Sequence, residues 1–188
     1  MKRVPVVAMS KPLVKGIPPV VSDTYESFTG NITIPKFLLA DQKYFAIEVL
    51  PSRLIDADEN WVLAGNDDVV TAILLSSLFP IWVRGITGKD EAKVNFKNSY
   101  NTFPFPSITR KQESELLERV SAIYKARGMA SGKQLSDLYC SGDIPEHLEM
   151  AHEDLDEVVL KIFNLPKDSS NQQILDRLFE EYLKLYQG

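Results

Sequence analysis

The stretch DDVVTAILLSSLFPIWVRG, residues 67–85, predicts a buried helix in the middle of the chain. Its apolar residues lie nearly all round the helix, which is typical of a helix covered by neighbours on every side. Asp67 and Asp68 favour the positive N-terminal end of a helix, and Gly85 can end it. Pro80 lacks a backbone donor, so we expect it to kink or split the helix.

Residues 1–66, before this helix, are rich in proline, glycine and β-branched residues. They predict short strands separated by Pro and Gly breaks, in the stretches VPVVAM (4–9), GIPPVV (16–21), NITI (31–34) and YFAIEVL (44–50). After the helix, AKVNFKN (92–98) alternates as a strand does. NTFPFP (101–106) is excluded from a helix interior, because its two prolines remove donors and restrict the residues before them.

Helical signals dominate after Pro106. Thr109 and Gln112 fit a capping box, and Gly128 with Gly132 can end the helix that it opens. One face of this helix carries Leu116, Leu117, Val120, Ile123 and Tyr124. Three more helices are predicted, from KQLSDLY (133–139), from the Asp143–Pro145 start to Pro166, and after Ser170 with Gln173. A shared core is expected for Leu116, Val120, Leu155, Val159, Leu178 and Leu185.

The predicted fold class is therefore α+β, with a mixed α/β domain over residues 1–107 and a small helical domain over residues 108–188. The 188 residues are 44% hydrophobic and 25% charged, which is ordinary globular composition. Cys140 is the single cysteine, so no intrachain disulfide can form, and a reducing compartment such as the cytoplasm is expected. No apolar run has the length of a membrane span.

Charge is unevenly distributed along the chain. The net charge is −5, and residues 111–188 hold 9 Lys and Arg against 15 Asp and Glu. Residues 82–110 instead carry Arg84, Lys89, Lys93, Lys97 and Arg110 against Asp90 and Glu91. Such a local basic stripe indicates a site more directly than the bulk charge does.

No self-contained catalytic, metal or cofactor site is apparent. His147 and His152 are five apart, which is the wrong spacing for a helical metal pair, so surface or capping roles are expected. Cys140 has no histidine motif near it. A solvated helix face is expected for the carboxylates Glu153, Asp154, Asp156 and Glu157. The Asn/Asp-Pro-Pro-aromatic motif of amino-methyltransferases and the Asp…Glu-x-Lys pattern of many nucleases are absent.

Four ordered stretches resemble MmeI-type restriction–modification proteins, which are adenine-N6 DNA methyltransferases that often carry a nuclease domain. LLSSLFPIWVRGITGK resembles the helix leading into their recognition stretch, and YNTFPFPSITRKQESELLERV resembles the junction that ends their target recognition domain. LSDLYCSGDIPEHLEMAHEDLDEVVLKIF resembles the family's "LADLYD…MP-x-L-x-x-AH-x-x-LD-x-x-V" run, and DRLFEEYLKLY its final helix. The likeness is strong over residues 76–187 and weak over 1–66.

The resemblance implies that residues 1–107 are most of a target recognition domain. A methyltransferase domain using S-adenosylmethionine, and Mg²⁺ where a nuclease is present, would lie before Met1. Double-stranded DNA and that methyltransferase domain are the implied partners, and this chain would hold no cofactor of its own.

The stretch from Lys89 to Asn98 offers acids, bases and amides, the three residue types that read base edges. In the family a reading pair two residues apart lies here, which matches Glu91, accepting from cytosine, and Lys93, donating to guanine. Asn95 and Asn98 are further base-reading candidates; phosphate candidates are Arg53, Arg84, Lys89 and Lys97. We expect four residues to dock this domain onto its neighbours: Tyr100, Asn101, Phe103 and Phe105. Trp82 is expected in the core.

Three alternatives remain open on the sequence alone. Residues 89–98 could form a solvated hairpin tip, or the chain could be a separate specificity subunit, although its interrupted helices do not suit the long coiled coil such a subunit needs. The acidic C-terminal part also fits a helical assembly module. Salt-dependent binding of duplex DNA separates a DNA reader from an assembly module.

Overall fold

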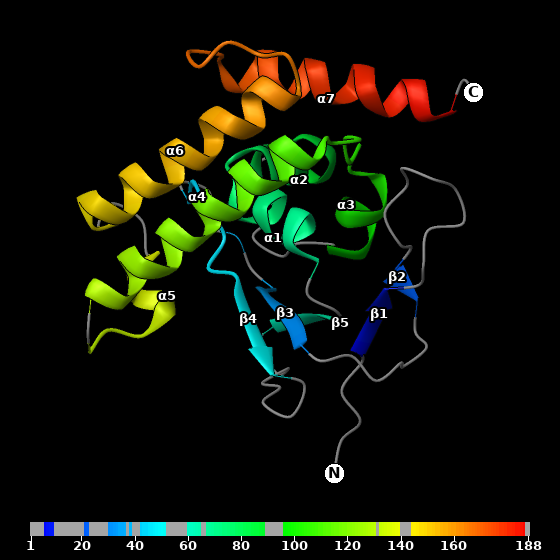
Figure 1. The fold of residues 1–188 in the computed structure, drawn as a ribbon. Helices are drawn as coiled ribbons and strands as arrows, with labels where there is room; N and C mark the ends of the chain where they lie inside the picture. Colours follow the sequence, from blue (N-terminus) through cyan, green and yellow to red (C-terminus); the bar gives the residue numbers. More distant parts are fainter. Residues whose placement is uncertain are drawn as a thin grey trace.

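The computed structural model describes residues 6–9, 21–22, 30–36, 38, 42–51, 60–64, 67–88, 96–130, 132–139 and 144–186. Strands gather at one side of the molecule, helices α1–α3 lie in the middle, and α4, α6 and α7 lie beyond them (Figure 1). This arrangement is the predicted α+β fold, with the strands early in the chain and the helices after them.

The described strands form a five-stranded sheet in the order β2-β1-β5-β3-β4. Their bounds are Val6–Met9 (β1), Val21–Ser22 (β2), Gly30–Pro35 (β3), Glu48–Pro51 (β4) and Asn60–Ala64 (β5). β1 pairs with β5 in parallel, and the other neighbours are antiparallel. Ile32 lies opposite Leu63 in this register, and both are fully buried. The first four strands overlap predicted stretches, whereas β5 was not predicted.

The predicted central helix is two helices, α1 (Asp68–Leu75) and α2 (Leu78–Thr87), bent by 69°. The break falls at Ser76, one turn before Pro80, because the proline ring of an unbroken helix would clash with the carbonyl four residues earlier. Pro80 itself sits in the first turn of α2, where a helix needs no backbone donor. Asp67 caps α1, with its side chain accepting the Val70 N–H at 2.9 Å.

Two boundary predictions for this region were wrong. Gly85 does not end α2, which continues to Thr87 and is followed by Gly88 at a φ of 88°. Residues 96–98 of the predicted strand belong instead to the helix α3, Phe96–Thr102. The helix wins here because Phe96, Tyr100 and Phe103 follow helical spacing and are all buried.

The C-terminal part consists of α4 (Arg110–Met129), α5 (Leu135–Leu138), α6 (Glu146–Ile162) and α7 (Asn171–Tyr186). The capping box of Thr109 with Gln112 is confirmed, and Ser170 makes the equivalent pair of bonds with Gln173 before α7. α4 runs one residue past Gly128. The predicted shared core is confirmed for all members except Leu185, which is 46% exposed.

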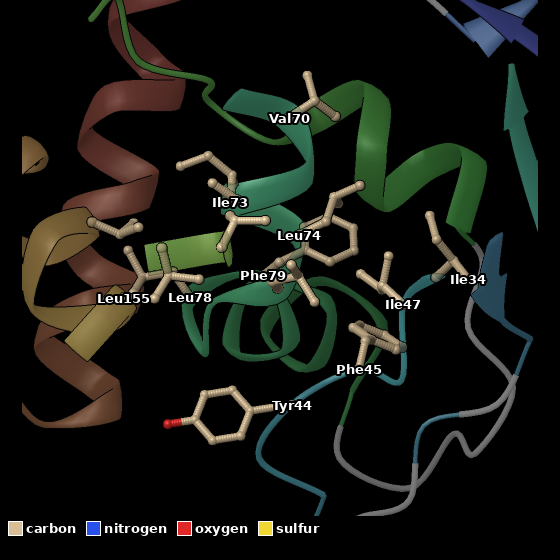
Figure 2. Packing of buried hydrophobic residues seen from close by; sticks show 14 of the residues in the cluster. Ile34, Tyr44, Phe45, Ile47, Val70, Ile73, Leu74, Leu78, Phe79 and Leu155 are labelled. Carbon is tan, nitrogen blue, oxygen red and sulfur yellow. The ribbon is translucent and has the colours of Figure 1, made fainter. Parts of the chain in front are cut away.

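One hydrophobic cluster joins both parts of the chain. It contains Ile34 of the sheet, Ile73 of α1, Phe79 of α2 and Leu155 of α6 (Figure 2). All residues of α1 from Val70 to Leu75 are buried, as the all-round apolar pattern predicted. The division into domains at residue 107 stays a prediction.

Among the described residues, no single helix is long and apolar enough to cross a membrane. The bent pair of α1 and α2 meets the length and composition only when the two helices are taken together.

Gly85 marks a close approach of α2 to α7. A Cβ at this position would lie 2.4 Å from Cδ1 of Leu175, so a side chain here forces the Leu175 side chain out of its present position. Gly85→Ala should therefore lower the free energy of unfolding by about 1 kcal/mol, the overpacking cost exceeding the gain in helix propensity. Urea denaturation measures the change.

Two further variants isolate the steric cause. In a Leu175→Ala background, Gly85→Ala should stabilise the protein by about 0.5–1 kcal/mol, because only the propensity gain is left. Gly128→Ala is the matched control, since a Cβ there meets nothing within 4 Å. Equal effects of Gly85→Ala in both backgrounds would contradict the close approach.

Candidate nucleic-acid interface

Half of the predicted DNA contacts fall between α2 and α3. Glu91, Lys93, Asn95 and Lys89 of this segment, and Arg53 earlier in the chain, lie outside the described residues. The structure describes the two ends of the segment, which are Gly88 after α2 and Phe96 at the start of α3.

Contacts between α2 and α3 hold these two ends in place relative to each other. The indole Nε1 of Trp82, in α2, donates to the Ser99 carbonyl of α3 at 3.1 Å. Phe79 of α2 also meets Phe96 edge to face, with ring centroids 6.0 Å apart. Trp82 is 1% exposed and is a core residue, as expected. The helix before and the helix after residues 89–95 are therefore fixed to each other.

The outer side of α3 carries two amides. Asn98 and Asn101 are exposed and three residues apart, so they share a helix face. The backbone of Lys97 lies on α3 beside them. Arg84, a predicted phosphate contact, is half-buried, and its guanidinium donates to the Gln42 carbonyl of the same chain.

The aromatic residues predicted to dock this domain onto its neighbours are buried in the core of this chain itself. Tyr100, Phe103 and Phe105 are buried, whereas Asn101 is not. Phe103 meets Phe163 after α6 with ring centroids 6.2 Å apart, so the aromatic run packs against the C-terminal part.

The break between α1 and α2 leaves polar backbone groups in the interior. The Ser77 N–H is one of them, and it donates to Oδ1 of Asp156 in α6 at 2.8 Å. The Tyr44 hydroxyl donates to the second carboxylate oxygen at 3.1 Å. Asp156 is only 7% exposed, so its predicted place on a solvated face was wrong. Glu153 and Asp154 do lie on that face.

The second backbone group at the break is the Leu75 carbonyl, which lies 3.0 Å from Nδ1 of His152. A carbonyl can only accept, so Nδ1 carries the proton and Nε2 accepts from the Tyr139 hydroxyl at 2.6 Å. His152 is 0% exposed and stacks on Tyr44 with ring centroids 4.2 Å apart, so the expected surface position was wrong for it, although it does bond the last carbonyl of α1. His147 is exposed.

Arg127 completes this network from α4. Its Nε and Nη2 donate to the Tyr139 oxygen at 2.8 and 2.6 Å, and its Nη1 donates to the Ile47 carbonyl at 2.7 Å. The network thus bonds the C-terminal helices to the segment before β4 as well as to the helix break.

Burial governs the titration of this network. Burial and, to a smaller extent, the nearby Arg127 charge together lower the pKa of His152 to about 3, so the ring is neutral near pH 7. Burial raises the pKa of Asp156, while the hydrogen bonds from Ser77 and Tyr44 oppose that rise. Among the described residues, no group of three or more His, Cys, Asp or Glu side chains could hold a metal ion.

Two family models cover nearly the whole chain. Residues 19–107 match the model described as "MmeI, target recognition domain", and residues 108–188 match "MmeI, C-terminal domain". The chain belongs to the MmeI family. The predicted resemblance is thereby confirmed.

Relatives of this MmeI-family chain are much longer than the chain itself. DNA methyltransferase A of Bacillus subtilis (strain 168) is 27% identical over 169 residues, which are 88% of this chain and 18% of that protein. The solved structure of the Type IIL restriction-modification enzyme MmeI in complex with DNA superposes with a TM-score of 0.77 at 25% identity, over 85% of this chain and 22% of that one. The chain thus spans about a fifth of the length of each.

Three residues of the buried polar network lie within the MmeI-like stretches. Tyr139 belongs to LSDLY, and His152 and Asp156 belong to AHEDLD. The helical spacing could have predicted that His152 and Asp156 are buried, because they fall on the same face of α6 as the buried Leu148 and Leu155.

His152 makes stability fall in acid. Its folded pKa lies below the unfolded value of 6.5, so between pH 6.5 and about 3 the unfolded chain binds a proton that the folded chain does not. This group should therefore remove about 1.4 kcal/mol of stability per pH unit as the pH falls through that window. In His152→Gln the stability at pH 7 should be lower, by about 1–3 kcal/mol, but the acid slope should be shallower by about 1.4 kcal/mol per pH unit.

Urea denaturation of both proteins from pH 8 to pH 4.5 measures the slopes. Toward pH 8 the two curves should become parallel, since His152 is then almost fully deprotonated in both states. The raised pKa of Asp156 acts in the opposite direction in acid, and it cancels because both proteins contain it. Identical acid slopes would show that His152 does not carry this pH dependence.

Proposed function

We propose that this chain is the sequence-reading module of a longer DNA methyltransferase of the restriction–modification type. The observation that carries the proposal is the match of residues 19–107 to the MmeI target recognition domain. The structural neighbour was solved in complex with DNA, which supports duplex DNA as the ligand. The basic stretch of residues 82–110 supplies charge of the right sign for phosphates.

The residue chemistry of the segment after α2 fits base reading in the major groove. Glu91 accepts from the cytosine amino group, and Lys93 donates to guanine acceptors. Asn95 and Asn98 have the amide groups that pair with adenine, and the exposure of Asn98 on α3 supports that role. Phosphate contacts are assigned to Arg53, Lys89 and Lys97; Arg84 instead holds Gln42.

The longer protein supplies the chemistry. We infer that its methyltransferase domain transfers a methyl group from S-adenosylmethionine to adenine N6 in the cytoplasm, with Mg²⁺ added where a nuclease domain is present. Residues 1–107 read the sequence, and residues 108–188 form a helical domain that supports them. This chain then contributes binding and orientation, and no catalytic residue.

The paired readers give the sharpest test. Selection of bound duplexes from a randomised library by this chain should yield a defined sequence. Glu91→Lys with Lys93→Asp should change that sequence, because each base contact contributes about 1–3 kcal/mol of discrimination. Lys89→Ala should weaken binding to every sequence and reduce the salt dependence by about one unit of slope.

Two outcomes contradict the assignment. Binding by the double variant to the wild-type sequence with wild-type affinity would show that the pair does not read DNA. Absence of any salt-dependent duplex binding by the wild-type chain would favour an assembly module instead.

A further inference from the structure

α2 is the element that delivers the recognition segment. Its ten residues, Leu78–Thr87, follow the break at Ser76 and Ser77, and Gly88 after them directly precedes residue 89. At 1.5 Å per residue such a helix is about 15 Å long. A tilt of about 5° at its start would therefore move its far end by about 1.3 Å, which exceeds the tolerance of a hydrogen bond to a base edge.

The start of α2 has no cap of its own. Its N-cap residue, Ser77, is in the α-helical conformation and its side chain makes no capping bond within the helix. The cap comes from Asp156, a residue 79 positions later in the chain, whose Oδ1 accepts the Ser77 N–H. A carboxylate at this place also faces the positive end of the α2 dipole.

The capping carboxylate is itself held in position. The Tyr44 hydroxyl bonds its other oxygen, and Tyr44 is fully buried and stacked on His152. At the far end of α2, Arg84 bonds the Gln42 carbonyl, two residues before Tyr44. Directional hydrogen bonds therefore restrain both ends of α2: Gln42 acts through Arg84, and Tyr44 acts through Asp156. The apolar contacts of α2 have no preferred direction.

We propose that Asp156 is a positioning residue for DNA recognition: by capping α2 from the C-terminal domain, it sets the direction in which the recognition segment leaves the core. This role rests on the proposed function. It assigns the C-terminal domain a part in sequence discrimination without any contact to DNA.

The test compares variants of the 188-residue chain. Asp156→Ala removes the acceptor, and Asp156→Asn keeps an oxygen in its place. Val120→Ala is the matched control, because it truncates a buried residue of α4, which packs on α1 and α6. Two readouts are used: hydrogen exchange at the Ser77 amide, and the preference for the selected duplex over its single-base variants.

Asp156→Ala should speed exchange at Ser77 about tenfold relative to the core amides of α6 and lower the sequence preference about tenfold. Binding to unrelated duplex should stay within about twofold. Asp156→Asn and Val120→Ala should keep the wild-type preference. Asp156→Glu covers the case in which Asp156→Ala does not fold: it keeps the charge but moves it by about 1.5 Å, so the preference should fall here too.

Several results would overturn the role. Wild-type preference in Asp156→Ala or Asp156→Glu would do so, as would an equal loss of preference in Val120→Ala, which would point to stability alone. If the wild-type chain selects no sequence, the proposed function fails and the positioning role fails with it. Exchange at Ser77 then still reports whether the cap exists, so the two failures are distinguishable.

Discussion

The interrupted backbone between α1 and α2 is the constraint on which the rest of the structure depends. Pro80 cannot share an unbroken helix with the Ser76 carbonyl, so the chain breaks inside the core and leaves a donor and an acceptor unpaired by helix bonds. Buried backbone groups of this kind must find partners. α6 brings one of each, since His152 donates to the Leu75 carbonyl and Asp156 accepts from the Ser77 N–H. The two side chains are one helical turn apart, which matches the two sides of the break.

This pairing explains why the N-terminal and C-terminal parts share a core. The apolar faces alone would allow α6 to slide along α1 and α2, because hydrophobic contact has no direction. Two bonds to fixed backbone atoms remove that freedom and set the register of α6. Arg127 and Tyr44 extend the same register to α4 and to the segment before β4. This fixed frame also holds α2 and α3, and with them Gly88 and Phe96 on either side of residues 89–95.

Local signals predicted much of this fold. The capping pairs at Thr109 and Ser170 marked helix starts because they act within three residues. The apolar pattern of residues 67–85 predicted burial on every side, and the proline predicted an interruption. Non-local features were missed: β5 was not recognised, and the partners of His152 and Asp156 are backbone atoms more than seventy residues earlier in the chain. The alternation misled for residues 96–98, where the aromatic residues Phe96 and Tyr100, four apart, favoured a helix. The base-reading roles of Glu91 and Lys93 follow from the family resemblance and stay a prediction.

The cap on α2 also bears on the order in which the chain can fold during synthesis. Ser77 leaves the ribosome long before Asp156 does, because 79 residues separate them. Until α6 emerges, the broken helix has unpaired polar groups and an uncovered apolar surface, so nascent recognition domains stay incomplete. A translation product that ends before α6 therefore lacks both partners of the break between α1 and α2, His152 for the Leu75 carbonyl and Asp156 for the Ser77 N–H.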